Sequence, residues 1–254
     1  NFLPMYPQKL EMGCYGKPVT KNGVTKVRIL RDENLAPFPR TEYAIRVNRQ
    51  EYYALITHMD EQIGRILAAL DATGKRDNTY IFFTADHGLA CGQHGLLGKQ
   101  NMYDHSMRVP FIVVGPDVPK NEQRDAPIYM QDVMPTALDL AKADKPKHVE
   151  FQSLVPLIKD ANQTSQRSEL YGCYLKDKQR MVRVGDWKLI VYPQAEVLKL
   201  FDLSKDPHEM NDLSKLPEHQ GKVDELYDQL VKLQEKMDDP MDLTVAFPRK
   251  AAVR

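Results

Sequence analysis

Residues able to carry out acid–base, metal or anion chemistry gather in one stretch of the chain, residues 80–116. Asp86 and His87 stand side by side on a turn closed by Gly88. A carboxylate oxygen and an imidazole nitrogen both suit a divalent cation, although an oxygen-rich site normally needs further carboxylates. The pair is therefore a candidate for part of a metal site. The alternative is an aspartate that caps the turn beside a surface histidine.

A second polar group follows in the same stretch: Lys99, which comes directly after Gly98 in a glycine-rich loop. A lysine ammonium can bind an anionic oxygen as a point charge. It can also stabilise negative charge that builds up on a leaving oxygen. Lys99 is therefore a candidate for binding an oxyanion and for catalysis. The alternative is a solvated surface lysine.

Two histidines in the same stretch, His94 and His105, could line the same pocket. Either could contact a substrate or transfer a proton. His105 has a structural, hydrogen-bonded role as its alternative. We expect Asp104 and Arg108 to form an internal salt bridge that shapes the loop. Cys91 lacks the local pattern of a nucleophile.

Apolar periodicity predicts the elements that would position these residues. A helix is expected over 41–73, followed by a strand over 79–83, a second strand over 110–114 and a helix over 129–140. This alternation predicts an α/β fold with a parallel or mixed sheet. Polar loops at the carboxyl ends of such strands are where α/β enzymes place their sites.

The pattern of apolar residues changes near residue 169. Short alternating runs, with a turn at Gly185-Asp186, predict a small antiparallel sheet, and a helix is expected over 217–237. We divide the chain into residues 1–160 and a small α+β subdomain, 161–254, with an antiparallel sheet and a C-terminal helix. Residues 1–42 predict an irregular surface segment with a short hairpin at Gly23, and the tail after Asp238 is expected to be extended.

Composition excludes several classes of partner. Lys+Arg and Asp+Glu are equal at 35 each, so the charge predicts neither nucleic acid nor a membrane surface. No apolar run reaches the ~18–20 residues of a membrane span. The 3 cysteines have no C-x-x-C spacing and argue against a disulfide framework. The first residues do not form a signal peptide.

Several motifs occur in the same order as in a known enzyme family. T-A-D-H-G, G-x-H-G, G-K and Y-D-H-S-M-R-V-P-F-I resemble the C-terminal half of the catalytic domain of type I, formylglycine-dependent sulfatases. The likeness is closest to the branch of iduronate-2-sulfatase and many bacterial polysaccharide sulfatases. Flanking segments extend the resemblance over nearly the whole chain; they are residues 52–84, 126–141, 180–190 and 200–214.

The resemblance implies an alkaline-phosphatase-like sheet sandwiched by helices, of which residues 1–160 would be the C-terminal portion. It implies that Asp86 and His87 ligate Ca²⁺, with Mg²⁺ as the alternative, together with two aspartates from the first strand. Many relatives have asparagine in place of His87, and the histidine variant is similar to the branch named above. Lys99 would contact the sulfate of a sulfate ester. The substrate would be a carbohydrate and the protein periplasmic or secreted.

The family's nucleophile is missing from this chain. Formylglycine is made from the cysteine or serine of C/S-x-P/A-x-R, and none of Cys14, Cys91, Cys173 or the serines lies in such a motif. The first-strand aspartates and the upstream sulfate-binding lysine and histidine are also absent, and in full-length relatives all lie N-terminal to Asn1. We therefore expect this chain to work with the N-terminal half of the same protein and to be inactive alone.

Two other interpretations stay open. The first is a phosphoester or phosphonate hydrolase of the alkaline phosphatase superfamily, whose fold and metal pair would look alike. The second is a non-catalytic sulfatase-like binding protein, which a gene beginning at Asn1 would favour.

Overall fold

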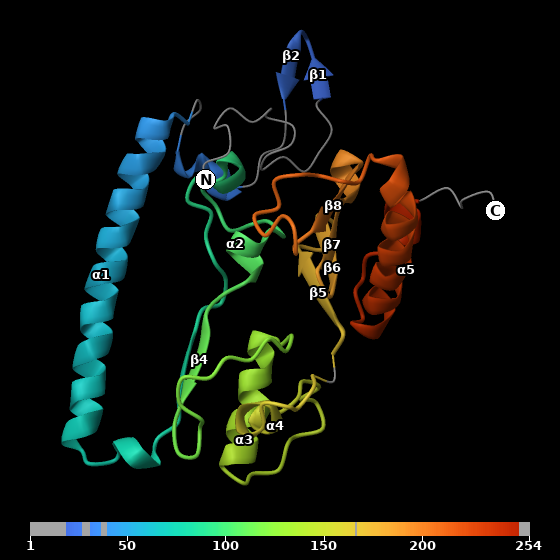
Figure 1. Ribbon diagram of the computed structural model, residues 1–254. Coiled ribbons are helices and arrows are strands. Elements are labelled where there is room, and N and C mark those ends of the chain that lie inside the picture. Colours follow the sequence, from blue (N-terminus) through green and yellow to red (C-terminus); the bar gives the residue numbers. More distant parts are fainter. Residues whose placement is uncertain (1–18, 27–30, 37–39, 166, 249–254) are drawn as a thin grey trace. The chain divides into compact units, whose positions relative to one another are not determined.

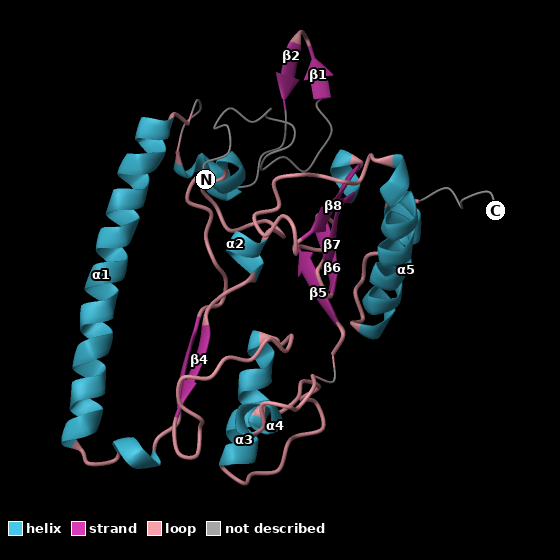
Figure 2. Cartoon of the chain, viewed as in Figure 1, coloured by secondary structure: helices cyan, strands magenta, loops and turns pink. Residues whose placement is uncertain are grey.

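The computed structural model describes residues 19–26, 31–36, 40–165 and 167–248 (Figures 1 and 2). The chain divides into two compact units. The first comprises residues 1–47, 87–108 and 169–254, and the second comprises 48–86 and 109–168. The loop that carries His87, His94, Lys99 and His105 therefore belongs to the same unit as the C-terminal residues.

The first unit is built on an antiparallel sheet of 4 strands in the order β5-β6-β7-β8 (Figure 1). The strands are β5 Glu169–Tyr174, β6 Gln179–Val184, β7 Trp187–Tyr192 and β8 Val197–Asp202. Gly185, with φ 56°, makes the tight turn between β6 and β7 in the left-handed region that glycine enters at little cost. This sheet confirms the predicted antiparallel arrangement.

The strands of this sheet carry apolar residues on both faces, as expected for a sheet that is covered on both sides. One face packs on helix α5, Gln220–Lys236, through Val182, Leu189, Leu200 and the helix residues Leu226 and Leu230. The opposite face carries a second apolar cluster, in which Met181, Ile190 and Phe201 of the strands meet Ala90, Leu96, Met102 and Tyr103. The loop that carries the predicted site residues is thus fixed to the sheet by its own apolar side chains.

The second unit contains strands β3 Ile81–Thr84 and β4 Phe111–Val114, with helices α3 Val133–Leu140 and α4 Val155–Lys159. Helix α1, Glu42–Ala72, contributes residues 48–72 to it. The buried Asp132, at the start of α3, accepts two hydrogen bonds of 2.7 Å from the guanidinium of Arg167. That carboxylate also accepts the backbone N–H groups of Tyr129 and Gln152, so it joins three segments of this unit.

Strands β3 and β4 differ from expectation in two ways. They pair antiparallel, so the parallel alternative is wrong for this pair; a parallel pair needs a crossover that returns the chain to the same end of the sheet. They are also less buried than the apolar sequence predicted, since Phe83, Ile112 and Val114 are 38%, 53% and 49% exposed. The alternating exposure along β4 shows that only one face of the pair is covered by the residues that the structure describes.

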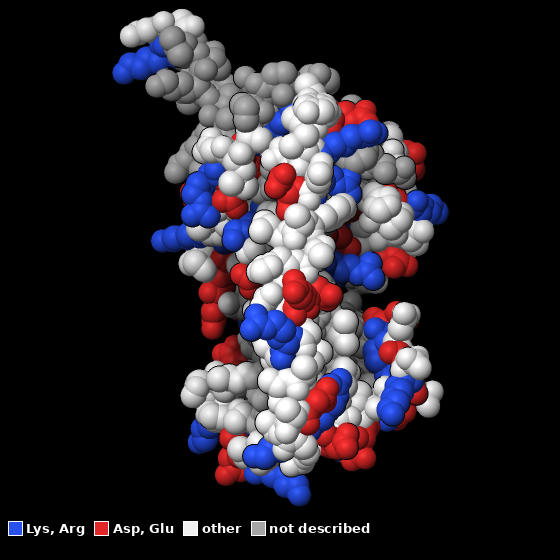
Figure 3. Space-filling model, turned by 90° about the vertical axis from the view of Figure 1, so that its left-hand side faces the viewer, with Lys and Arg blue, Asp and Glu red and all other residues white. Residues whose placement is uncertain are grey.

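Helix α1 confirms the predicted helix over 41–73, and Gly74, with φ 68°, follows its end. Its apolar residues are largely uncovered: Leu55, Met59 and Ile66 are 67%, 48% and 67% exposed. Figure 3 shows uncharged surface running along this helix between scattered charged side chains. Among the described residues, no helix combines the length and apolar character that crossing a membrane requires.

The two ends of the chain correct two expectations. The hairpin at Gly23 is confirmed as β1 Val19–Lys21 and β2 Val24–Lys26. The expected surface segment is only partly correct, because Glu33 and Arg40 are buried whereas Asn34 and Leu35 are exposed. The rest of this expectation, over residues 1–18, 27–30 and 37–39, lies outside the described residues. The tail is not simply extended: it contains the short helix α6 Leu243–Ala246, capped by the Asp242 carboxylate through the Thr244 N–H.

The remaining elements are short helical turns. They are α2 Asp104–Met107 and the 3-10 turns η1 Arg31–Leu35, η2 Arg76–Asn78, η3 Gln93–Gly95, η4 Met130–Asp132, η5 Pro193–Ala195 and η6 Pro217–His219.

Candidate functional site

The turn that follows β3 is locked by backbone contacts. The Gly88 N–H donates a hydrogen bond of 2.9 Å to the Ser106 carbonyl oxygen. A Cβ atom at Gly88 would lie 1.9 Å from the carbonyl oxygen of His105, so only glycine fits here. The position of His87, directly before this glycine, is therefore tied to the α2 turn.

The His87 Nδ1 lies at hydrogen-bond distance, 3.0 Å, from the Gly88 carbonyl oxygen. A carbonyl oxygen only accepts, so Nδ1 carries the proton and, in the neutral ring, Nε2 carries the lone pair. Histidines that ligate metals are commonly held by such a bond to the second ring nitrogen. The donor chemistry of His87 therefore fits a metal ligand that uses Nε2.

Asp86 immediately precedes His87 and is exposed. The boundary between the two units falls between these two residues. In the part of the chain that the structure describes, no group of three or more His, Cys, Asp or Glu side chains could hold a metal ion. One carboxylate and one imidazole can supply only part of a Ca²⁺ shell of ~6–8 ligands.

Lys99 is half-buried in a loop whose backbone is fixed on both sides. The Gly98 carbonyl oxygen accepts from Ala90 N at 3.0 Å, and the Lys99 carbonyl oxygen accepts from Asn101 N at 2.9 Å. No ion pair of its ammonium occurs with any described residue. The loop therefore fixes the main chain from which the Lys99 side chain extends.

His94, Tyr103 and His105 form one ring cluster. The rings of His94 and Tyr103 stack, with centroids 3.8 Å apart and an angle of 10° between their planes, and the His105 centroid lies 5.7 Å from both. His94 has φ 51°, in the left-handed region. The structure thus brings together the two histidines that the sequence proposed for one pocket.

Burial governs the charge of both histidines. It lowers the pKa of His94 to about 4 and the pKa of His105 to about 3, with the nearby Lys199 adding to the first shift and His94 itself to the second. The His105 Nε2 atom is buried without a hydrogen-bond partner among the described residues. Both rings are therefore neutral near pH 7, so they could donate or accept hydrogen bonds but would not supply positive charge.

Asp104 has a different partner from the one expected. Its carboxylate pairs with the fully buried Lys188 of β7 at 2.7 Å and with Arg183 at 3.7 Å, so the predicted salt bridge to Arg108 is wrong. Lys188 also pairs with Glu209 at 2.6 Å, and the other Glu209 oxygen accepts the Asp104 N–H. Lys188 comes 84 residues after Asp104, a separation at which sequence spacing carries no signal.

Sequence reasoning missed Glu33 and Arg40, which contact the loop that bears Lys99. Their charged groups lie 2.5 Å apart, and both side chains are almost completely buried. The only signal available was the occurrence of an acid and a base in a proline-rich segment. Residue type alone does not indicate burial, because most Glu and Arg side chains are exposed.

Two family models match the chain. The sulfatase model matches residues 15–143, and the model for the C-terminal part of N-sulphoglucosamine sulphohydrolase matches residues 92–236. The chain belongs to the sulfatase family. Arylsulfatase K of Gallus gallus is 33% identical to this sulfatase chain over 204 residues, which cover 75% of the chain and 38% of the relative.

Solved structures agree with this assignment. A protein bound to its substrate, D-glucosamine-2-N,6-O-disulfate, superposes on this sulfatase chain with a TM-score of 0.73 at 29% identity and covers 83% of the chain and 45% of its own length. A phosphonate monoester hydrolase from Silicibacter pomeroyi gives 0.69 at 26% identity, with 85% of the chain and 46% of the hydrolase covered. The predicted family and its alkaline-phosphatase-like fold are confirmed. The chain spans less than half the length of these relatives.

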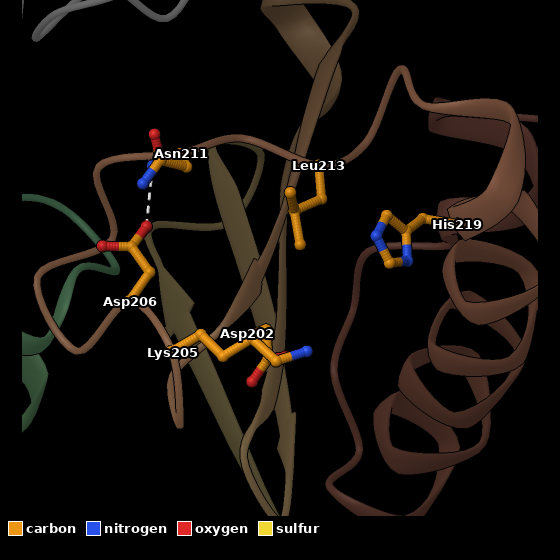
Figure 4. A pocket seen from close by; sticks show the side chains of 6 residues that line it. All are labelled: Asp202, Lys205, Asp206, Asn211, Leu213 and His219. Carbon is orange, nitrogen blue, oxygen red and sulfur yellow. Dashed lines mark hydrogen bonds and ion pairs between the residues drawn. The ribbon is translucent and has the colours of Figure 1, made fainter.

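The first unit of this sulfatase chain also has a hollow of about 230 Å³, lined by Asp202, Lys205, Asp206, Asn211, Leu213 and His219 (Figure 4). None of the predicted site residues lines it. Its carboxylates serve local structure, because Asp206 accepts the Asn211 N–H at 2.7 Å and Asp202 accepts the Ser204 hydroxyl at 2.6 Å. We therefore assign it no part in the chemistry.

Proposed function

We propose that this chain is part of a sulfuric ester hydrolase that acts on a sulfated carbohydrate, with Lys99 as its sulfate-binding and catalytic lysine. The observation that carries the proposal is that Lys99 is a half-buried residue in a loop whose main chain is anchored on both sides, and that its ammonium has no ion-pair partner among the described residues. A cation placed in this way is suited to an anionic ligand. The sulfated glucosamine bound by a solved relative supports a sulfated sugar as the substrate class.

The proposed chemistry divides among a few side chains. Lys99 would bind a sulfate oxygen and then offset the negative charge that develops on the leaving oxygen. His94 and His105, both neutral, would line the pocket and form hydrogen bonds with the sugar or the leaving group. Asp86 and the His87 Nε2 would hold Ca²⁺, or alternatively Mg²⁺, which when bound supplies Lewis-acid charge neutralisation.

The proposal includes the arrangement of the whole protein. The N-terminal half would contribute formylglycine and the remaining metal ligands, and its packing would cover the exposed apolar residues of α1, β3 and β4. Residues 1–160 would belong to the catalytic domain and 161–254 to the C-terminal subdomain. A periplasmic or secreted location follows from the family likeness.

The test is substitution of Lys99 in the whole protein. Lys99→Ala is expected to lower kcat for a sulfate monoester by about 10²–10³, the loss typical of removing one donor to a developing oxyanion. Lys120→Ala, on an exposed lysine, is the control and should leave kcat unchanged. Full turnover by the Lys99→Ala protein would exclude Lys99 from catalysis.

The same assay separates the two alternatives. The phosphonate monoester hydrolase among the structural relatives makes phosphonate esters the competing substrate class. A kcat/KM for a phosphonate monoester above that for the sulfate ester would favour this alternative. A whole protein that binds a sulfated sugar and turns over neither ester would favour the non-catalytic binding protein.

A further inference from the structure

A buried ion pair lies against the loop that presents Lys99. The Arg40 Nη1 and the Glu33 Oε2 are 2.5 Å apart, and the two side chains are only 1% and 2% exposed. Glu33 lies in the η1 turn, and Arg40 lies two residues before α1. The catalytic role proposed above does not use either residue.

Both members of the pair bind the main chain of residues 95–98. Glu33 accepts hydrogen bonds from the Leu97 N–H at 3.2 Å and from the Gly98 N–H at 3.0 Å. Arg40 donates to the Gly95 carbonyl oxygen at 2.7 Å. One carboxylate and one guanidinium therefore hold both ends of the four residues that lead into Lys99. Charge-assisted bonds of this kind are roughly twice as strong as neutral ones.

The fit between these groups is close. A Cβ atom at Gly98 would lie 2.5 Å from the Asp32 Cβ and 2.8 Å from the Glu33 Oε1, so the loop needs glycine to reach the carboxylate. On the far side of Lys99, the Gln100 carbonyl oxygen accepts from the Gln179 Nε2 at 3.0 Å. The residues that flank Lys99 are thus each tied to a separate segment of the first unit.

Stability alone does not account for this arrangement. A buried ion pair can often be replaced by packed apolar residues without loss of stability, because removing two charges from water is costly. Glu33 does what no apolar residue can: it accepts two adjacent main-chain N–H groups that would otherwise be buried without partners. The pair is therefore suited to fixing one loop conformation.

We propose that Glu33 and Arg40 are positioning residues for Lys99, which hold residues 95–98 so that the ammonium stands where the sulfate oxygens develop charge. The proposal rests on the proposed role of Lys99 for its catalytic part. Misplacing a catalytic group by about 1 Å can lower a rate by about 10²-fold. Loss of the pair should therefore be visible in turnover.

The test variant is Glu33→Gln in the whole protein. Glutamine has nearly the same shape, but it presents an amide NH₂ where a second acceptor is needed. We expect the Leu97 and Gly98 amides to exchange hydrogen faster by about tenfold, the effect of losing one ordinary hydrogen bond. We expect kcat for the sulfate ester to fall by about 10–100-fold. Glu122→Gln is the matched control, because Glu122 pairs with Arg124 at 2.6 Å but is 45% exposed.

A double-variant cycle distinguishes positioning from general structural support. In protein that already carries Lys99→Ala, adding Glu33→Gln should change kcat by less than about twofold, because the group that Glu33 positions is gone. A further fall of the same size as in the wild-type background would overturn the proposal. So would faster exchange at Leu97 and Gly98 with unchanged kcat.

Arg40→Lys is the second test variant, to be used if the Glu33→Gln protein does not fold. Lysine keeps the charge but lacks the guanidinium fork that reaches both Glu33 and the Gly95 carbonyl oxygen. The same fall in kcat, again absent in the Lys99→Ala background, supports positioning, and an unchanged kcat overturns it. Failure of the proposed function would appear separately, as full turnover by the single Lys99→Ala variant.

Discussion

At the scale of single residues, the burial of His94 and His105 beside Tyr103 makes both rings resist protonation in the folded chain. Their pKa values are lowered to about 4 and about 3, from an ordinary value of 6.5. In the unfolded chain these rings are exposed and take up protons at the ordinary value. Between pH 6.5 and 4 the unfolded state therefore binds more protons than the folded state, and folding becomes less favourable as the pH falls.

We predict that the free energy of unfolding decreases as the pH is lowered from 6.5 to 5, with a slope approaching ~1.4 kcal/mol per pH unit for each histidine. Urea titrations at a series of pH values would measure it. The double variant His94→Asn and His105→Gln should show a flatter dependence; asparagine suits the left-handed backbone at His94. His58→Asn, on the exposed surface of α1, is the control. An unchanged slope in the double variant would contradict the assignment to these rings.

The candidate residues themselves were predictable to different degrees. Asp86, His87, Lys99, His94 and His105 were named from their types and from a motif order that resembles sulfatases. Their roles stay predictions, while the stacking of His94 on Tyr103 is visible only in the structure. The sequence did not identify Glu33, Arg40 and Lys188 as buried residues near the site. Their burial depends on contacts with residues that are distant in the chain.

At the scale of elements, helix α1 illustrates how a correctly predicted helix can lack its expected environment. Its apolar spacing predicted the helix, and the helix forms over Glu42–Ala72. The same spacing would lead one to expect a buried stripe, yet among its residues only Ile45 is buried. Helix formation follows from local sequence, whereas burial depends on a neighbour that the described residues do not supply.

We predict that this chain, expressed alone, self-associates or binds an apolar dye through α1. The double variant Leu55→Ser and Ile66→Ser should reduce both effects. It should change the free energy of unfolding by less than about 1 kcal/mol, because both side chains are 67% exposed and make few contacts to lose. Sedimentation velocity and urea unfolding would measure the two effects. Loss of several kcal/mol would show that these side chains are buried in the chain itself.

The antiparallel C-terminal sheet and its turn at Gly185 were predicted, because alternating apolar residues and turn residues agreed there. Strands β3 and β4 were also located, but their antiparallel direction was not determined by the alternation of helices and strands. Direction depends on the path of the connecting chain, which local patterns do not report.

At the scale of the whole molecule, the proposed site needs more groups than the residues assigned to it on this chain. Asp86 and His87 could supply about two of the ~6–8 ligands usual for Ca²⁺. The motif that yields formylglycine does not occur in these 254 residues.

We predict that this chain alone hydrolyses no sulfate ester and binds Ca²⁺ with a Kd weaker than ~1 mM, because most of the coordination shell is not on it. Turnover of a chromogenic aryl sulfate and calorimetric titration with CaCl₂ would test the two parts. The whole protein, assayed in parallel, is the control. Robust turnover by the chain alone would show that it carries its own nucleophile.

The sequence by itself determined the family, the positions of most helices and strands and the candidate residues, because these depend on local periodicity and on a motif order that is already linear in the chain. Tertiary structure alone decided which buried charged residues bind the loop that carries the candidate residues. Lys188 reaches Asp104 across 84 residues, and Glu33 reaches Gly98 across 65. Only folding brings such charges together, and only their burial makes the pairing strong enough to fix a loop.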